Sequence, residues 1–474
     1  MTDFLYRFRS VDRLLGNDER TGELEGQYIY FASPEQLNDP LEGYRELYFS
    51  GDKIVWASLF KYYIRCLALR SLQYLVGRDI SDIPFPVITS LNNVPVEVSE
   101  KTNSASDIFL KNENIIKFVE HLSKSERRVT KHELLTHLRS MHLYAFHLVT
   151  KIYADIGLVP HETKILTMTE DELLRSSTGL LAETKNLDGL AYEAAIYAAD
   201  GNQFLKNYSI YKSGDSSSWH KITLNFANDF IESLRELTHE KWYTACFMDS
   251  CSNSSIWGSY GDNHAGVCMR FKPNISNDKQ SLSFHMPIGS GSNGIMWGDN
   301  ELGFYKVKYE GTHPDLDFFR TIGICSRREL EENWYSDTEG NISTCADVLR
   351  DETEWRKNYW DRRQESITSK MPDWTNENEY RLILENGLSI FNSGKDRCLK
   401  YAFKSLEGII FGIKTPAEDK YKILEVVEAL CDKHQREGFQ FYQAFHDAET
   451  KTIKYRPLLS VSCNKPEATQ SVHD

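Results

Sequence analysis

The sequence has few cysteines, and none stands in a spacing typical of metal sites or disulfide frameworks. Its nine cysteines are an odd number and mostly isolated, and the closest pair, Cys246 and Cys251, is not a CxxC motif. Small secreted folds need paired cysteines, and structural zinc sites need closely spaced pairs of ligands. The pattern therefore predicts reduced thiols in a cytoplasmic protein, with no structural metal.

Long apolar runs and an excess of positive charge are also missing. No window approaches the roughly 20 apolar residues of a membrane-spanning helix, and the N-terminus MTDFLYRFRSVDRLLGN lacks the apolar segment of a signal peptide. We therefore expect no membrane association. The 55 Lys and Arg against 69 Asp and Glu give a net charge of −14. This charge balance does not suggest broad nucleic-acid binding through phosphates. It is still compatible with a local basic patch.

The common catalytic motifs are absent as well. The chain contains no HEXXH, no P-loop and no GxSxG, and the glycine-rich run that begins at Gly289 lacks the strand-to-helix context that a phosphate loop needs. His132, His137, His142 and His147 recur every five residues. On an α-helix five residues turn about 140° beyond a full turn, so this series spirals around the helix. The sequence therefore predicts no metal site at these histidines.

A chain of 474 residues is long enough for two or three domains. Residues 52–238 carry apolar side chains at helical spacing, which predicts core faces of helices. Two such stripes are Ile222, Phe226, Phe230 and Leu234, and Leu134, Leu138, Met141 and Ala145. We predict an α+β fold in which residues 1–50 and 240–460 form a mixed-sheet core, split by a helical insertion at 52–238.

The C-terminal part predicts one βαβ unit. Gly408–Ile413 is a continuous apolar strand, a helix follows from Thr415, and Phe439–Phe445 is the next strand. Short links between these elements indicate parallel neighbouring strands. The tail, residues 464–474, has too little apolar content to fold and is expected to be disordered.

The stretch from Lys241 to Phe271 predicts two strands, Trp242–Phe247 and Gly266–Phe271, joined by a polar aromatic turn. Tyr260 and His264 are four residues apart, so one helical turn would place both on the same side. Such a turn suits one wall of a cleft. The alternative is a surface turn between core strands.

Residues Trp374–Leu384 predict a strand with a charged face. Period two places Glu377, Glu379 and Arg381 together, with the apolar side chains on the opposite face. Two carboxylates this close repel when both are ionised, and a flanking arginine helps to keep them charged. The pair suits a catalytic centre, a metal site or a cation-stabilising site. The alternative is a solvated face with a cross-strand salt bridge.

The N-terminal region predicts a strand at Phe4–Arg9 and a helical turn opened by Ser33. That turn ends at Asn38 and Asp39, which either contribute to a site or form a structural Asx turn.

Four motifs together resemble the bacterial domain-of-unknown-function 2971 family, which occurs in microbes and mobile elements. The motifs are LYRFRS at 5–10, YFASP at 30–34 with LNDPLE at 37–42, CF at 246–247 with WGSYGDNHAGVC at 257–268, and Trp374 with ENEYR at 377–381. The resemblance covers about residues 1–50 and 240–445. Leu41 and Gly258 depart from it. The family supplies no established activity.

A second resemblance, to ADP-ribosyltransferases, implies a chemistry. In that fold an early arginine or histidine holds NAD and a late glutamate engages the nicotinamide ribose. The resemblance implies Arg7 or Arg9 with Ser33 for the first role, and Glu379 as catalytic residue with Glu377 as its partner. The other implied substrate contacts are Tyr6, Asn38, Asp39, Trp257, Tyr260, His264 and Arg381.

The resulting hypothesis is an NAD-consuming transferase or glycohydrolase, a toxin or phage-defence effector with a small-molecule nucleotide as substrate and an unidentified macromolecular acceptor. Two alternatives stay open. One is a metal-dependent nuclease using Asp39, Glu42, Glu377 and Glu379, because clustered carboxylates suit Mg²⁺. Against it, the sequence shows no obvious lysine beside the acidic pair and no basic track. The other is a non-catalytic sensor that binds a partner protein through the helical insertion.

Overall fold

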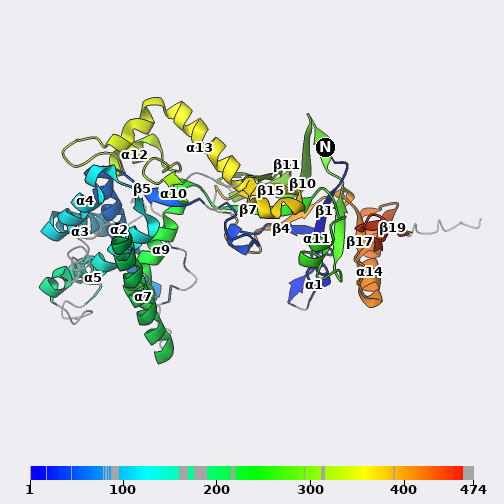
Figure 1. Cartoon of the computed structure of the whole chain (residues 1–474), viewed down its shortest axis with the longest axis horizontal. Helices are drawn as coiled ribbons and strands as arrows, with labels where there is room; N and C mark the ends of the chain where they lie inside the picture. Colours follow the sequence, from blue (N-terminus) through cyan, green and yellow to red (C-terminus); the bar gives the residue numbers. More distant parts are fainter. Residues whose placement is uncertain are drawn as a thin grey trace, which may run out of the picture. The chain divides into compact units, whose positions relative to one another are not determined.

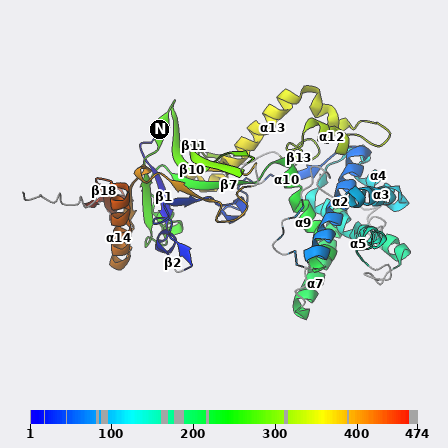
Figure 2. The same cartoon turned by 180° about the vertical axis from the view of Figure 1, so that it is seen from behind.

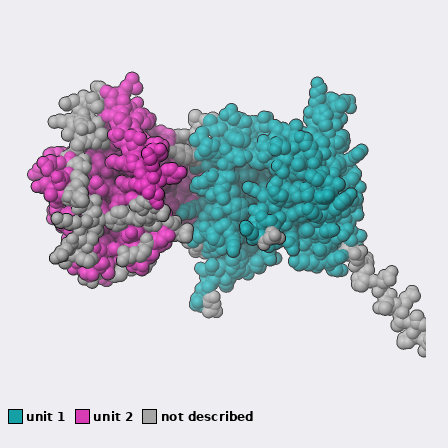
Figure 3. Space-filling view, turned by 90° about the horizontal axis from the view of Figure 1, so that it is seen from below, with its two compact units in different colours: residues 1–44, 241–313, 364–474 teal, residues 45–240, 314–363 magenta. Residues whose placement is uncertain are grey.

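The computed structural model describes residues 2–462 apart from short segments and single positions. The exceptions are 18, 44, 78, 81–82, 84, 87–95, 160–168, 176–188, 215–218, 293, 311–314 and 388–389. The tail predicted at 464–474 lies outside the described residues. Two compact units make up the chain (Figure 3): a sheet unit of Met1–Tyr44, Lys241–His313 and Gln364–Asp474, and a helical unit of Arg45–Glu240 and Pro314–Arg363.

A large mixed sheet dominates the sheet unit, and twelve strands of the described residues take part in it. In spatial order they are β19 (Thr452–Val461), β18 (Phe439–Asp447), β17 (Leu406–Phe411), β8 (Val267–Phe271), β1 (Leu5–Arg9), β7 (Trp242–Met248), β15 (Glu379–Glu385), β11 (Gly294–Lys306), β10 (Lys279–Gly291), β16 (Cys398–Tyr401) and β4 (Tyr28–Tyr30), with β9 (Asn274–Ser276) on β10. β1 lies in the middle of this order. It pairs antiparallel with β7 and β8, the two strands predicted around the aromatic turn.

The predicted βαβ unit is confirmed. β17 and β18 are parallel neighbours, and α14 (Ala417–His434) connects them. Ile423 and Val427 on one side of α14 are buried in the same hydrophobic cluster as these strands. α14 lies beside this end of the sheet in Figure 1 and, seen from behind, in Figure 2. Together with the mixed sheet, this makes the fold α+β, as predicted.

Short elements complete the sheet unit. The helices are α1 (Val11–Leu15), α11 (Ser254–Ser259) and the 3-10 turns η1 (Pro34–Gln36), η5 (Pro372–Glu377) and η6 (Phe403–Ser405). The short strands are β2 (Gly16–Asn17), β3 (Arg20–Thr21), β12 (Lys308–Tyr309) and β14 (Ser369–Lys370). β12 and β14 pair in parallel beside the start of β15 and thereby shape the site described below.

The helical unit is built mainly from long helices. They are α2 (Lys53–Gly77), α3 (Val96–Lys111), α4 (Glu113–Leu122), α5 (Lys131–Asp155), α7 (Gly189–Ser213), α8 (Trp219–Thr223), α9 (Phe226–Ser233), α10 (Arg235–Thr238), α12 (Arg327–Asn333) and α13 (Glu352–Ile367), with the 3-10 turns η3 (Lys124–Glu126) and η4 (Thr344–Asp351). All members of the two predicted apolar stripes are buried. Among the helices described here, none combines the length and the apolar content needed to cross a bilayer.

The helical unit extends beyond residues 52–238. β5 (Leu47–Phe49) pairs with β13 (Leu316–Asp317) and with β6 (Val129–Thr130), so the strand that precedes the insertion is tied both to the interior of the insertion and to a segment far downstream. Phe318 and Trp334 from that downstream segment belong to the helical core. Residues 314–363, polar in the sequence, therefore contribute large apolar side chains to this unit.

Candidate active site

Glu377, Glu379 and Arg381 do lie together, but not as members of one regular strand. Glu377 is the last residue of η5, and β15 begins only at Glu379. Asn378 between them has φ 43° and ψ 52°, a left-handed conformation that asparagine tolerates well. The predicted strand at Trp374–Leu384 was therefore too long at its start. The alternative of a solvated face is wrong, because all three charged side chains are buried.

Lys370 lies between the two carboxylates. The parallel pairing of β12 with β14 sets Tyr309 opposite Lys370. The Lys370 Nζ atom lies 2.7 Å from Glu377 Oε2 and 3.4 Å from Glu379 Oε2. It also lies 4.6 Å from the centre of the Trp374 ring, a cation–π distance. One ammonium group thus bridges both glutamates.

Arg381 holds the other side of Glu379. Its Nε and Nη2 atoms donate to the two oxygens of Glu379 at 2.7 and 3.1 Å, and Nη1 donates to the Ile367 carbonyl at 2.9 Å. Nη2 is also ion-paired with Glu42. A forked, two-point contact fixes the carboxylate plane as well as its charge.

The turn at residues 38–42 supplies two further carboxylates. Asp39 Oδ1 accepts from the Leu41 backbone N–H at 2.9 Å, an Asx turn, and the Glu42 N–H donates to the Asp39 carbonyl at 3.2 Å. This turn directs Glu42 to Arg381 and to within 3.6 Å of Lys370. Within the described part of the chain, the buried Asp39 Oδ2 has no hydrogen-bond partner.

The side chains of Asp39, Glu42, Lys370, Glu377, Glu379 and Arg381 form a charged cluster. Tyr260 connects this cluster to the surface. Its hydroxyl donates to Glu377 Oε1 at 2.5 Å, and Asn38 hydrogen-bonds to the same phenol. Tyr260 is half-buried and Asn38 is exposed. Burial first, and then the Glu377 charge, raises the pKa of Tyr260, so the phenol remains a donor at neutral pH.

The cluster is electrostatically unbalanced. Asp39, Glu42, Glu377 and Glu379 carry −4 when ionised, and Lys370 and Arg381 carry +2, which leaves −2. Burial raises the pKa of Glu379 from 4.5 to about 7; Lys370 and a hydrogen bond from Cys246 oppose this shift, and Glu377 adds to it.

The two cations stay charged at neutral pH. Burial alone would lower the pKa of Lys370, but Glu379 and Glu377 raise it. Burial lowers the pKa of Arg381 to about 9, and Asp39 opposes that shift. Glu379 is therefore the group whose protonation relieves the excess negative charge near neutral pH.

His264 does not join Tyr260, contrary to the prediction. α11 ends at Ser259, and Asp262, Asn263 and His264 all have left-handed backbones with φ between 50° and 71°. The turn is therefore not helical beyond Tyr260. His264 stacks on Trp257 at 6.5 Å between ring centres.

Trp257 is a core residue. Its Nε1–H donates to the Cys251 carbonyl at 2.8 Å, and the Phe8 ring packs edge-on at 4.9 Å. It supports the loop that carries Tyr260, and within the described part of the chain its hydrogen bond and ring contacts do not involve the carboxylates.

The N-terminal residues predicted to hold NAD have partners of their own. Arg7 is buried and donates to the carbonyls of Cys246 and Tyr30 at 3.1 and 3.0 Å. Arg9 pairs with Glu23 at 2.6 Å.

Tyr6 and Ser33 also make local contacts. The Tyr6 hydroxyl lies 3.1 Å from that of Tyr455. The Ser33 N–H donates to Gln36 Oε1 at 3.1 Å, at the start of η1. None of these four predicted residues has a recorded side-chain contact with the cluster among the described residues.

Lys370 is the site residue that sequence reasoning missed. It lies seven positions before Glu377 in a polar stretch. That interval matches two turns of an α-helix, but Lys370 lies on β14 and Glu377 ends η5, so no single regular element carries both. The absence of a lysine beside the acidic pair was an argument against the nuclease hypothesis, and Lys370 removes that argument.

A second group of titratable side chains lies in the helical unit. Ligand atoms of His121, Glu133 and His137 lie within 4.8 Å of one another, a spacing suited to a metal. Arg127 already donates to both oxygens of Glu133, and its Nη2 lies 3.1 Å from His121 Nε2. Burial, and then Arg127, lower the pKa of His121 to about 4. The guanidinium therefore supplies the positive charge at this position.

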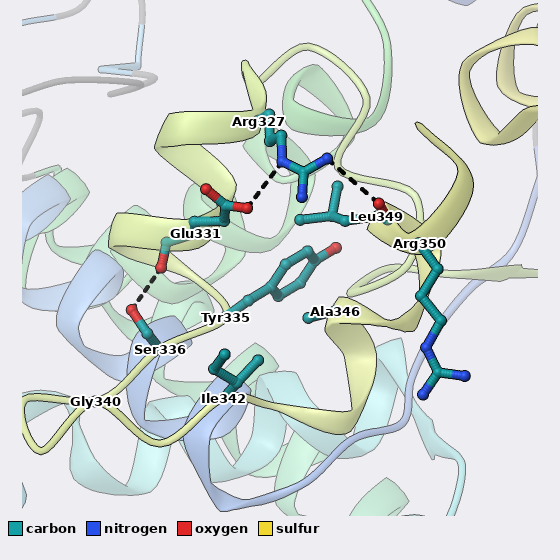
Figure 4. Close-up of a pocket in the computed structure, with 9 residues that line it drawn as sticks. All are labelled: Arg327, Glu331, Tyr335, Ser336, Gly340, Ile342, Ala346, Leu349 and Arg350. Atoms are coloured by element: carbon teal, nitrogen blue, oxygen red, sulfur yellow. Dashed lines mark hydrogen bonds and ion pairs between the residues drawn. The ribbon is translucent and has the colours of Figure 1, made fainter. Parts of the chain in front are cut away.

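A pocket in the helical unit offers no comparable chemistry (Figure 4). Arg327 at its edge donates to Glu331 at 2.9 Å and to the Leu349 carbonyl at 3.4 Å, and the Ser336 hydroxyl donates to the Glu331 carbonyl. Arg327, Glu331 and Ser336 thus already have partners within the wall.

The cluster lies largely in a stretch that matches a known family. Residues 256–382 match DUF2971, described as a protein of unknown function. The DUF2971 region contains Tyr260, Lys370, Glu377, Glu379 and Arg381. Neither a curated protein nor a solved structure matches the chain. The DUF2971 match supports the first resemblance, and the likeness to ADP-ribosyltransferases gains no support from it.

Proposed function

We propose that the sheet unit cleaves the bond between nicotinamide and ribose in NAD, as a transferase or a glycohydrolase. The observation that carries this proposal is the Lys370 bridge between the paired carboxylates of Glu377 and Glu379. Breaking this bond sends its electron pair to the nicotinamide nitrogen and leaves positive charge on the ribose. A fixed carboxylate stabilises such a charge where it develops.

Each group then has a role. Arg381 and Lys370 hold Glu379 in one orientation, so no reorganisation is needed as the charge develops. Water or an acceptor hydroxyl forms the new bond to the ribose carbon, and its proton passes to a carboxylate of the pair. Tyr260 donates to Glu377 and thereby orients the second carboxylate toward a ribose hydroxyl.

The substrate would be held at the accessible edge of the cluster. Asn38 is exposed, and Tyr260 and Trp374 are half-buried. Their amide and aromatic groups suit a nucleotide's ribose and bases. Arg7 and Arg9, engaged elsewhere, do not contribute to this version of the proposal.

The test is incubation of the purified full chain with NAD, with nicotinamide release followed by chromatography. We expect release by wild type and by Glu428→Gln, an exposed change on α14, and loss of release in Glu379→Gln. A parallel incubation with Mg²⁺ and single- or double-stranded nucleic acid tests the second candidate. Nucleic-acid cleavage without NAD consumption would replace the proposal.

The second candidate, a metal-dependent nuclease, is favoured by one observation: all four of its carboxylates gather around Lys370 and Arg381. The donor set does not suit a metal well, because Glu42, Glu377 and Glu379 are already paired with these cations. Among the described residues, the grouping with metal-ligand spacing lies instead at His121, Glu133 and His137.

The raised pKa of Glu379 predicts that the free energy of unfolding falls, and that turnover rises, as the pH increases. A carboxyl whose pKa rises from 4.5 to about 7 on folding binds protons more tightly when folded. Its contribution to the free energy of unfolding is therefore complete below about pH 4.5 and is lost as pH rises through about 7. If the carboxylate form is active, turnover rises over the same range.

Denaturation curves and NAD turnover between about pH 4 and about pH 8, a range that brackets the shift, provide the measurement. In Glu379→Gln this component of the stability profile should vanish. Identical pH profiles for the free energies of unfolding of wild type and variant would show that Glu379 does not titrate in this range.

A further inference from the structure

α7 in the helical unit presents an apolar seam to solvent. Seven residues recur at alternating spacings of four and three: Leu190, Ala194, Tyr197, Gly201, Phe204, Tyr208 and Tyr211. This is the spacing of a coiled-coil interface. All seven are exposed, and the five large side chains are between 54% and 84% exposed.

The opposite side of α7 already has a partner within its unit. Ile196 and Gln203 are buried, the Tyr192 hydroxyl donates to Glu133, and Asp200 pairs with Arg139. Apart from a contact between the rings of Tyr197 and His132, whose centres lie 4.9 Å apart, the seam therefore does not face the core of its own unit. In Figures 1 and 2 the C-terminal part of α7 extends past α5 and α9.

The seam alternates small and large residues. Ala194, Gly201 and Tyr208 occupy one set of core positions, two of them small, and Leu190, Tyr197, Phe204 and Tyr211 occupy the other. In an antiparallel pair of identical helices, each layer joins one position of the first set to one of the second. Each small residue then receives an aromatic ring, for example Gly201 against Phe204 and Ala194 against Tyr211.

Gly201 gives independent support. A glycine inside a helix is less stable than alanine there, so it usually has a packing reason. A Cβ added at Gly201 would meet nothing within 4 Å in this chain. Close approach by a second molecule would explain why position 201 is glycine, because no neighbour within the chain requires it.

The charged residues of α7 also favour an antiparallel pair. Glu193 lies in the first half of α7, and Lys206 and Lys212 lie in the second half, all exposed. An antiparallel pair places the acidic half of one helix against the basic half of the other. The two helix dipoles then also point in opposite directions, which is favourable. A parallel pair would place like charges together.

We propose that α7 is a self-association surface, through which two copies of the chain form an antiparallel two-helix interface. Self-complementary surfaces of this kind generate closed two-fold dimers. This inference does not depend on the proposed activity.

Sedimentation of the full chain across the micromolar range tests it. Wild type and Val76→Glu, an apolar-to-acidic change at another exposed helix position, should show the same monomer–dimer equilibrium. Phe204→Glu and Gly201→Leu should weaken it at least about tenfold, as for central interface residues. Gly201→Leu should also raise the helix content of the monomer, which separates a lost interface from a damaged fold. A monomeric wild type, or a dimer unaffected by both variants, would overturn the proposal.

Orientation is tested by mild oxidation of cysteine variants, with wild type as background. A mixture of Ala194→Cys with Tyr211→Cys chains should give a disulfide-linked dimer. Each of the two variants oxidised alone should give none. Crosslinking of Ala194→Cys with itself indicates a parallel pair and contradicts the antiparallel arrangement.

Discussion

Replacing Glu379 by glutamine is expected to lower NAD turnover by a factor of about a hundred or more, the usual loss for a group that stabilises transition-state charge. Glutamine keeps the shape of the side chain and removes its charge. Four carboxylates against two cations become three against two, so the net charge of the cluster falls from −2 to −1 and the fold should remain. Nicotinamide release by matched amounts of both proteins is the measurement.

Two controls separate catalysis from folding. Glu428→Gln makes the same chemical change on the exposed side of α14 and should leave turnover unchanged. Melting curves of wild type and Glu379→Gln should agree below about pH 4, where Glu379 is protonated in both the folded and the unfolded chain. Equal turnover in the two proteins removes Glu379 from the mechanism. A variant that unfolds shows that the carboxylate serves the fold.

Replacing Arg381 by methionine is expected to lower the free energy of unfolding by about 3–5 kcal/mol, as for breaking a buried ion pair from one side. Arg381 is fully buried and contacts Glu42, Glu379 and the Ile367 carbonyl. Methionine fills a similar volume but leaves two carboxylates without this counter-charge. Chemical denaturation of the full chain, followed through the transition of the sheet unit, measures the loss.

Arg13→Met provides the matched control, because Arg13 is exposed on α1 of the same unit. It should leave that transition unchanged. In a double-mutant cycle, adding Glu42→Gln to Arg381→Met should cost less than the sum of the single changes, because the second change removes one of the stranded charges. Strict additivity would show that Glu42 and Arg381 do not interact.

The sequence predicted which charged residues lie near one another. It said less about the backbone conformation and the burial of these residues. Period two correctly grouped Glu379 with Arg381 on β15. It also extended the strand back to Trp374, because nothing local distinguishes Asn378 as a left-handed turn from an ordinary strand residue. Burial of the group depends on neighbouring strands, which a single segment cannot specify.

The stretch from Lys241 to Phe271 shows the same division. The strands on either side of the aromatic turn were predicted from their apolar, β-rich composition, and β7 and β8 confirm them. Spacing alone placed Tyr260 and His264 on one side. Three consecutive left-handed residues end that helical pattern, so the phenol reaches Glu377 and the imidazole reaches Trp257.

By itself the sequence determined the features that depend on local periodicity and short links. These are the α+β class, the buried helical stripes and the parallel pair around α14, because side-chain spacing and loop length decide them within a few tens of residues. Only the tertiary structure decided that Lys370 bridges Glu377 and Glu379 and that Glu42 reaches Arg381. Those contacts join segments up to several hundred residues apart, and their strength depends on a burial that exists only once the sheet has formed.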